Sequence, residues 1–140
     1  MLWIFGGTYS FIEQYGINRD LVFNQGQYFR LFTYMFIHGG IEHILSNMIF
    51  VFIYGVRFEK YCGIKNTALI YFVSGILGAL LSLAADGSGF SVGASGAIFG
   101  LFGAFLVVAK KTKQNLGGIG QITILAVVVM GIGMGRLDSG

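Results

Sequence analysis

The sequence predicts an all-α fold, a polytopic bundle of transmembrane helices, and three observations support this prediction. Hydrophobic residues make up 55% of the 140 residues and charged residues only 11%, whereas a soluble domain carries roughly a quarter charged residues. Long apolar segments without charges recur along the chain. Many of the 23 glycines lie inside these segments, where small residues let membrane helices approach closely. The length allows one domain, residues 1–140.

Four apolar segments have roughly the length of a membrane crossing, which takes about 20 residues. The first contains the polar residues His43 and Asn47, and the other three carry no charge. We therefore expect four full spans in this chain. They cover residues 41–56, 67–85, 90–109 and 116–135.

The chain begins with an apolar stretch, residues 1–12, that ends at Glu13. This stretch is too short to cross a bilayer. A signal peptide is the other reading, but a signal peptide has a basic start and a small-residue cleavage site, which this stretch lacks. We expect it to be the end of a transmembrane helix that starts before Met1.

The connection over residues 13–40 is rich in aromatic side chains, which favour the interface between membrane and water. Because unpaired backbone groups are not tolerated in lipid, we expect a folded loop that is partly embedded. Its aromatic residues are Tyr15, Phe23, Tyr28, Phe29, Phe32, Tyr34 and Phe36.

The basic residues predict the orientation. Residues 57–65 hold three lysines or arginines and residues 110–113 hold another three, whereas the opposite side holds only Arg19, Arg30 and Arg136. The positive-inside rule therefore places residues 57–65 and 110–113 in the cytoplasm.

With this orientation, His43, Asn47 and Ser95 all lie in the outer part of the membrane. His43 and Asn47 are four residues apart and share one helix face. Both offer hydrogen-bond donors, so together they could hold an oxyanion. Ser95 lies in a Gly-Ala-Ser-Gly segment, residues 93–96, at the start of a helix, where free amides stabilise negative charge. This setting suits a serine nucleophile, which still needs a base.

Each of these residues also has a structural reading. Gly96 and Gly100 form a G-x-x-x-G pattern, which is typical of helix packing in membranes. His38 and His43 are candidates for metal ligands, but their spacing puts them on different helix faces and no third ligand accompanies them. Cys62 is the only cysteine, so the chain has no internal disulfide.

A set of residues along the chain has a characteristic order and spacing. Its members are Arg30, Leu31, Thr33, Phe36, His38, His43, Asn47, Met48, Glu59, Gly93, Ser95 and Gly96. This pattern resembles the rhomboid family of intramembrane serine proteases. The resemblance is good over about residues 25–109 and weaker elsewhere. Phe29 stands where members often have Trp, which is a mild departure.

The resemblance implies roles for these residues. Ser95 would be the nucleophile, and His43 and Asn47 would form the oxyanion hole with the Ser95 amide. Arg30 and His38 would belong to the structured first loop. The remaining expected roles are structural for Glu59, close packing for Gly93 and Gly96, and an aromatic ring against the base for Phe99.

The family's base is a histidine on a final transmembrane helix, which residues 1–140 do not contain. The ending after Arg136 resembles the residues just before that histidine. We therefore expect a fragment of a rhomboid-like domain, truncated at both ends and inactive by itself, whose complete form has six spans. His43 as the base is an alternative reading.

The expected function is cleavage of peptide bonds in or near transmembrane segments of other membrane proteins. The expected partners are these substrates and the lipid bilayer, with no nucleic acid, metal or cofactor. The compact chain suits a bacterial inner membrane. Two rivals are an inactive rhomboid-like protein that binds membrane clients and a fragment of a transporter or channel, although the inverted repeats and broken helices of many transporters are not evident.

Overall fold

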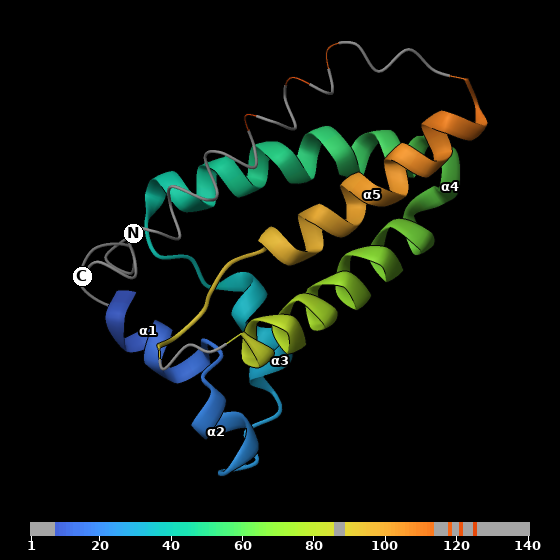
Figure 1. Cartoon of the computed structure of the whole chain (residues 1–140). Helices are drawn as coiled ribbons and strands as arrows, with labels where there is room; N and C mark the ends of the chain where they lie inside the picture. Colours follow the sequence, from blue (N-terminus) through green and yellow to red (C-terminus); the bar gives the residue numbers. More distant parts are fainter. Residues whose placement is uncertain (1–7, 86–88, 114–117, 119–120, 122–124, 126–140) are drawn as a thin grey trace.

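The computed structural model describes residues 8–85 and 89–113, together with residues 118, 121 and 125, and these form a helical assembly (Figure 1). Four short helices lie in the first part of the chain and two long ones follow. The elements are α1 (Thr8–Tyr15), α2 (Arg19–Phe23), α3 (Arg30–Thr33), the 3-10 helix η1 (Tyr34–Phe36), α4 (Ile41–Ala84) and α5 (Ser95–Lys111).

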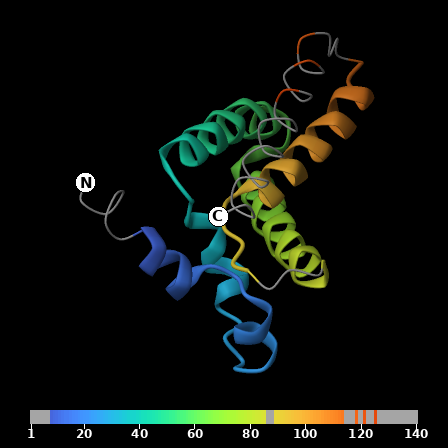
Figure 2. The same ribbon diagram turned by 60° about the vertical axis from the view of Figure 1, so that its left-hand side comes forward.

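Helix α4 is divided by a sharp kink at Gly63, where φ is 81° and ψ is 164°. Only glycine adopts this conformation at little cost, because it has no Cβ. The kink separates a first arm, residues 41–62, from a second arm, residues 64–84. Figures 1 and 2 show that the second arm turns back at the kink and diverges from the first, and Figure 1 shows α5 between the two arms.

The prediction of a loop over residues 57–65 is wrong, because these residues are helical apart from the kink at Gly63. Arg57 donates from Nη1 to the Ile53 carbonyl at 2.9 Å, and the Thr67 hydroxyl donates to the Gly63 carbonyl at 2.9 Å. These bonds support the helix on both sides of the kink. A single glycine is enough to reverse the chain direction.

Among the described residues, α4 is one helix that is long and apolar enough to cross a membrane, with a mean hydropathy of 2.0. Each arm has roughly the length of one crossing at about 1.5 Å per residue. Helix α5 has 17 residues, near the lower limit of about 17 for a span. The span expected over residues 116–135 lies outside the described residues apart from three positions, so the number of crossings stays a prediction.

Helix α5 packs against the first arm of α4 through a continuous apolar core. Every third or fourth residue of each helix faces the other, as expected for packed helices. The buried members of this core are Phe50, Tyr54 and Phe58 on α4, and Ala94, Ile98, Leu101, Phe105 and Ala109 at and along α5.

Helix α5 also crosses the second arm of α4 at a pair of glycines. A Cβ atom built on Gly78 would lie 3.1 Å from the Cα of Gly96, and one built on Gly96 would lie 3.2 Å from the Cα of Gly78. The two backbones are therefore in contact, which the small-residue pattern in the sequence predicts for membrane helices.

The connection over residues 13–40 is folded, and it packs against the second arm and the start of α5. Five of its aromatic side chains are more than 45% exposed, and this agrees with a lipid or interfacial position for them. Tyr34 is the exception, because it is 5% exposed and belongs to the core. This second core contains Ile17, Val22, Tyr34, Met35, Ala79, Leu83 and Ala97.

The glycine crossing makes a testable prediction about stability. Gly78→Ala should lower the free energy of unfolding by about 1–2 kcal/mol, because its methyl group forces two backbones apart. Gly103→Ala is the matched control, since nothing lies within 4 Å of a Cβ at Gly103. It should be neutral or gain up to about 1 kcal/mol from helix propensity. Unfolding of the full-length protein by SDS in mixed micelles measures both, and equal effects would contradict the crossing.

Candidate active site

The segment before Ser95 is extended and is held by the connection over residues 13–40. Ile17 and Ser91 exchange two backbone hydrogen bonds, of 3.0 and 2.9 Å. The Gly93 amide donates to the Tyr34 carbonyl at 2.9 Å. The expected span over residues 90–109 therefore begins as a helix only at Ser95, because residues 89–94 bond to another part of the chain.

Ser95 is the first residue of α5 and is partly buried. The preceding Ala94 has no polar side chain that could bond the free amides of the first helical turn. These amides carry the positive end of the helix dipole. The backbone around Ser95 can therefore stabilise negative charge next to its hydroxyl.

Gly93 brings the polar residues of α4 close to Ser95. Its φ of 111° favours glycine. A Cβ built on Gly93 would lie 2.7 Å from His43 Nε2 and 3.4 Å from Asn47 Nδ2. The imidazole edge and the amide thus lie directly against the backbone two residues before Ser95, and any larger residue at this position would displace them.

The hydrogen bond that His43 accepts determines which of its two ring nitrogens carries the proton. The Gly39 amide donates to His43 Nδ1 at 3.3 Å, so Nδ1 acts as an acceptor. A neutral histidine with an accepting Nδ1 carries its proton on Nε2. Because Nε2 is the nitrogen next to Gly93, His43 presents a donor to the site rather than a free lone pair.

Asn47 is fully buried, at 0% exposure. Within the described part of the chain, neither its amide nitrogen nor its amide oxygen has a hydrogen-bond partner. A buried polar group without a partner is costly and calls for an explanation. A transient anion or an ordered water next to Gly93 would satisfy the amide nitrogen.

His38 lies in the link between η1 and α4, and its ring meets the His43 ring edge-on, with centroids 5.1 Å apart. Neither ring nitrogen makes a close hydrogen bond among the described residues, and a weaker interaction with the Phe36 backbone remains. Burial and the neighbouring His43 lower the pKa of His38 to about 4. His38 is therefore neutral at physiological pH and forms the wall behind His43.

Arg30 is buried and organises the connection over residues 13–40. Its Nη1 donates to the carbonyls of Glu13 and Gly16, at 2.9 and 2.7 Å, and its Nε donates to Gln27 Oε1 at 2.7 Å. The carbonyls at the end of α1 thus receive charged donors. Arg30 acts on the site only through the shape of this connection.

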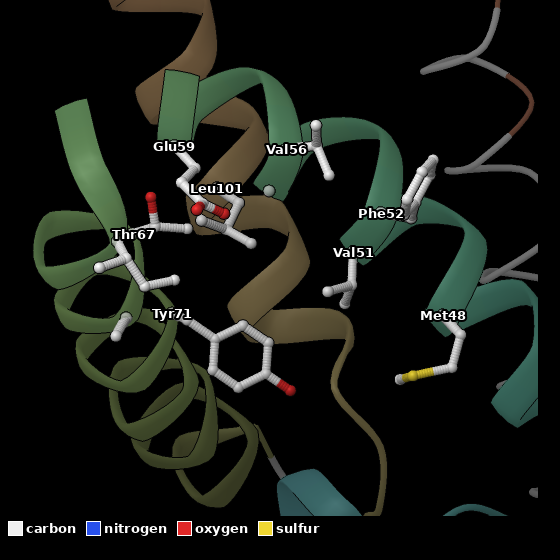
Figure 3. Close-up of a pocket in the computed structure, with 11 residues that line it drawn as sticks. Met48, Val51, Phe52, Val56, Glu59, Thr67, Tyr71 and Leu101 are labelled. Atoms are coloured by element: carbon white, nitrogen blue, oxygen red, sulfur yellow. The ribbon is translucent and has the colours of Figure 1, made fainter. Parts of the chain in front are cut away.

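Glu59 lies far from Ser95, at the rim of an apolar groove between the two arms of α4 and α5. The groove has a volume of about 410 Å³, and it runs from Met48 toward the kink. Figure 3 shows Glu59 close to Thr67 and Leu101, with the Tyr71 ring deeper in the groove. This arrangement places Glu59 near the predicted cytoplasmic end of the first arm of α4, away from Ser95.

The remaining expected site residues lie along α5. Gly96 contacts the second arm of α4 at Gly78, and Phe99 is 43% exposed one turn after Ser95. No group of three or more His, Cys, Asp or Glu side chains is gathered to hold a metal ion within the described residues.

The sequence reasoning missed Tyr34, which it grouped with the interfacial aromatics. The structure places Tyr34 in the core, with its carbonyl bonded to the Gly93 amide and its hydroxyl bonded to the Gly75 carbonyl. No local pattern in the sequence distinguishes Tyr34 from its exposed aromatic neighbours. Only its contacts with α4 and with the segment before Ser95 reveal it.

The structure places His43 and Asn47, one turn apart on an apolar helix, against Gly93, two residues before Ser95 at a helix start. This arrangement fits an integral membrane protein of the rhomboid type. The Rhomboid domain family matches residues 25–140, and the chain belongs to this family. It is 35% identical over 137 residues to RHOMBOID-like protein 7 of Arabidopsis thaliana, which covers 96% of this chain.

Two further relatives extend the comparison. RHOMBOID-like protein 6, mitochondrial, of Arabidopsis thaliana is 40% identical over 94% of this chain. Rhomboid protease GluP of Bacillus subtilis is 34% identical over 86% of it. The chain spans 44% of the length of both Arabidopsis proteins and 24% of GluP. No solved structure matches the chain.

The low pKa of His38 predicts that stability depends on pH. The folded protein binds this proton only near pH 4, whereas the unfolded chain binds it near pH 6.5. Between these values the unfolded state holds more protons, so stability should fall as the pH drops from 6.5 to 4. Thermal unfolding in detergent at pH 7.5 and 4.5 measures the loss. The loss should be smaller in His38→Gln, and an equal loss would contradict the assignment.

Proposed function

We propose that the full-length protein is an intramembrane serine endopeptidase that cleaves other membrane proteins in or near their transmembrane segments. The observation that carries this proposal is the packing of His43 Nε2 and Asn47 Nδ2 against Gly93, two residues before Ser95. Two side-chain donors therefore lie at the turn that leads into Ser95, next to the free amides of a helix start. Such an arrangement suits the oxyanion of acyl transfer.

In the proposed mechanism, Ser95 Oγ attacks the carbonyl carbon of the substrate and loses its proton to a base. The negative charge moves to the carbonyl oxygen, where His43 Nε2–H, Asn47 Nδ2–H and the Ser95 amide donate to it. The C–N bond then breaks, the amine leaves with the proton, and an ester to Ser95 remains. Water hydrolyses this ester and restores the serine.

The base is proposed to be a histidine supplied by a part of the full-length protein outside residues 1–140, as the family resemblance implies. His43 suits this role poorly. Its Nδ1 accepts the Gly39 amide and its Nε2 carries the proton, so neither nitrogen is free to take the proton of Ser95. The hydrogen bond from Gly39 therefore favours His43 as an oxyanion donor.

Several properties of the proposed enzyme follow from its site. The substrates are transmembrane segments, because Ser95 lies at the end of an apolar helix in the predicted outer part of the bilayer. No metal or cofactor takes part in the proposed reaction, and no nucleic acid is a proposed partner. A bacterial inner membrane suits the compact chain, although the relatives come from plants as well as bacteria.

The nucleophile is tested by covalent labelling. Full-length protein in detergent should react with a fluorescent alkylphosphonate at Ser95, because its oxyanion hole also stabilises the phosphonyl transition state. Ser95→Ala should abolish labelling. Ser46→Ala is the matched control and should still be labelled, because Ser46 lies on α4 and its hydroxyl donates to the His43 carbonyl. Gel fluorescence measures the product. Labelling that persists in Ser95→Ala would overturn the assignment of Ser95 as the nucleophile. No labelling of the wild type would favour the inactive client-binding alternative.

The oxyanion donors are tested by substitution. Asn47→Ala and His43→Gln should each lower kcat by about 10²–10³-fold, which is the usual cost of losing one such donor. The matched control is Asn66→Ala, on the exposed surface of α4. Cleavage of a transmembrane substrate in vesicles measures the rates. Substantial activity in His43→Gln would rule out His43 as the sole base, and unchanged activity in Asn47→Ala would remove Asn47 from the site.

A further inference from the structure

Tyr34 contacts the chain on both sides of Ser95, although it lies about 60 residues earlier in the sequence. We propose that Tyr34 is a positioning residue that sets the location of the Ser95 hydroxyl for reaction. This inference rests on the proposed function of Ser95. It goes beyond that function, because Tyr34 is not among the residues proposed to take part in the reaction.

The first contact is made by the main chain. The Tyr34 carbonyl accepts a hydrogen bond of 2.9 Å from the Gly93 amide. Gly93 is the residue whose positive φ turns the extended segment into the start of α5. The bond therefore fixes the turn that leads into Ser95, on the same residue against which His43 Nε2 lies.

The second contact is made by the phenol hydroxyl, which reaches the helix crossing behind Ser95. It donates to the Gly75 carbonyl on the second arm of α4, and a helical carbonyl has a second lone pair for such a bond. The same oxygen would lie 3.3 Å from a Cβ on Gly78 and 3.4 Å from one on Gly96. Gly96 directly follows Ser95, so the hydroxyl lies next to the residue on the other side of the serine.

The two contacts form a bridge of three elements. The carbonyl ties η1 to the segment before Ser95, and the hydroxyl ties η1 to the second arm of α4. Because Gly78 and Gly96 have no side chains, the hydroxyl fits beside their contact. If the hydroxyl bond is lost, η1, the Gly93 turn and the start of α5 can shift relative to one another.

The surroundings keep Tyr34 in its donating form. Burial, with a smaller contribution from Tyr71, raises the pKa of Tyr34 to about 12. The phenol therefore keeps its proton throughout the physiological range, and its bond to Gly75 does not depend on pH there. Reacting groups lose large factors in rate when they are displaced by about 1 Å, so a small shift of Ser95 is measurable.

The test removes the hydroxyl and keeps the ring. In the full-length protein, Tyr34→Phe should slow alkylphosphonate labelling of Ser95 about tenfold. For a transmembrane substrate, kcat should fall by a similar factor while KM stays within about twofold, because no substrate contact is removed. Tyr28→Phe is the matched control, since Tyr28 lies in the same connection as Tyr34 and its side chain is 61% exposed. It should leave the labelling rate unchanged.

A second pair of variants distinguishes a positioning role of Tyr34 from a merely structural one. The same pair tests the proposal if Tyr34→Phe does not fold. In one, 4-fluorophenylalanine at position 34 fills the space of the hydroxyl without a donor. In the other, 4-aminophenylalanine returns an N–H donor. We expect slow labelling in the first and restored labelling in the second, both measured well below the unfolding temperature.

The outcomes are distinguishable. Equal labelling rates in the fluoro and amino variants, at whatever stability, would overturn the positioning role of Tyr34 and leave the proposed function intact. A wild-type protein that reacts with no phosphonate and cleaves no substrate would overturn the proposed function, and this inference with it.

Discussion

The contact between Gly78 and Gly96 is the constraint on which the rest of the site depends. It lets the start of α5 press against the second arm of α4, with less than the width of a methyl group between the two backbones. Gly96 is the neighbour of Ser95, so this contact sets how deep the serine lies. The aliphatic and aromatic core between α5 and the first arm then fixes the helix along its remaining length.

The connection over residues 13–40 holds the segment before Ser95 in place. Arg30 holds its shape by bonding carbonyls at and just after the end of α1, and Ile17 pairs with Ser91 in the segment before Ser95. Tyr34 bonds both that segment and the second arm. A loop that forms these bonds with two other parts of the chain is a structural element of the membrane domain, because it satisfies backbone groups that lipid cannot.

The proposed site contains a polar side chain that does not stabilise the fold. Asn47 is fully buried, and both of its amide atoms are unpaired in the described part of the chain. Unpaired polar atoms in such surroundings oppose folding. Their cost is understandable if they serve charge that develops only during a reaction, as the proposed oxyanion would.

The sequence by itself determined the helical class, the apolar segments around His43 and Ser95, and the one helix face that His43 and Asn47 share, because composition and helical period are local properties. It placed the reversal between the first two spans in a loop and the start of α5 five residues too early, since neither the conformation of Gly63 nor the pairing of Ser91 with Ile17 is visible locally. Only the tertiary structure decided that His43 and Asn47 pack against Gly93 and that Tyr34 is buried. These contacts join residues about 40 to 60 positions apart, and they depend on backbone approaches that helical periodicity does not encode.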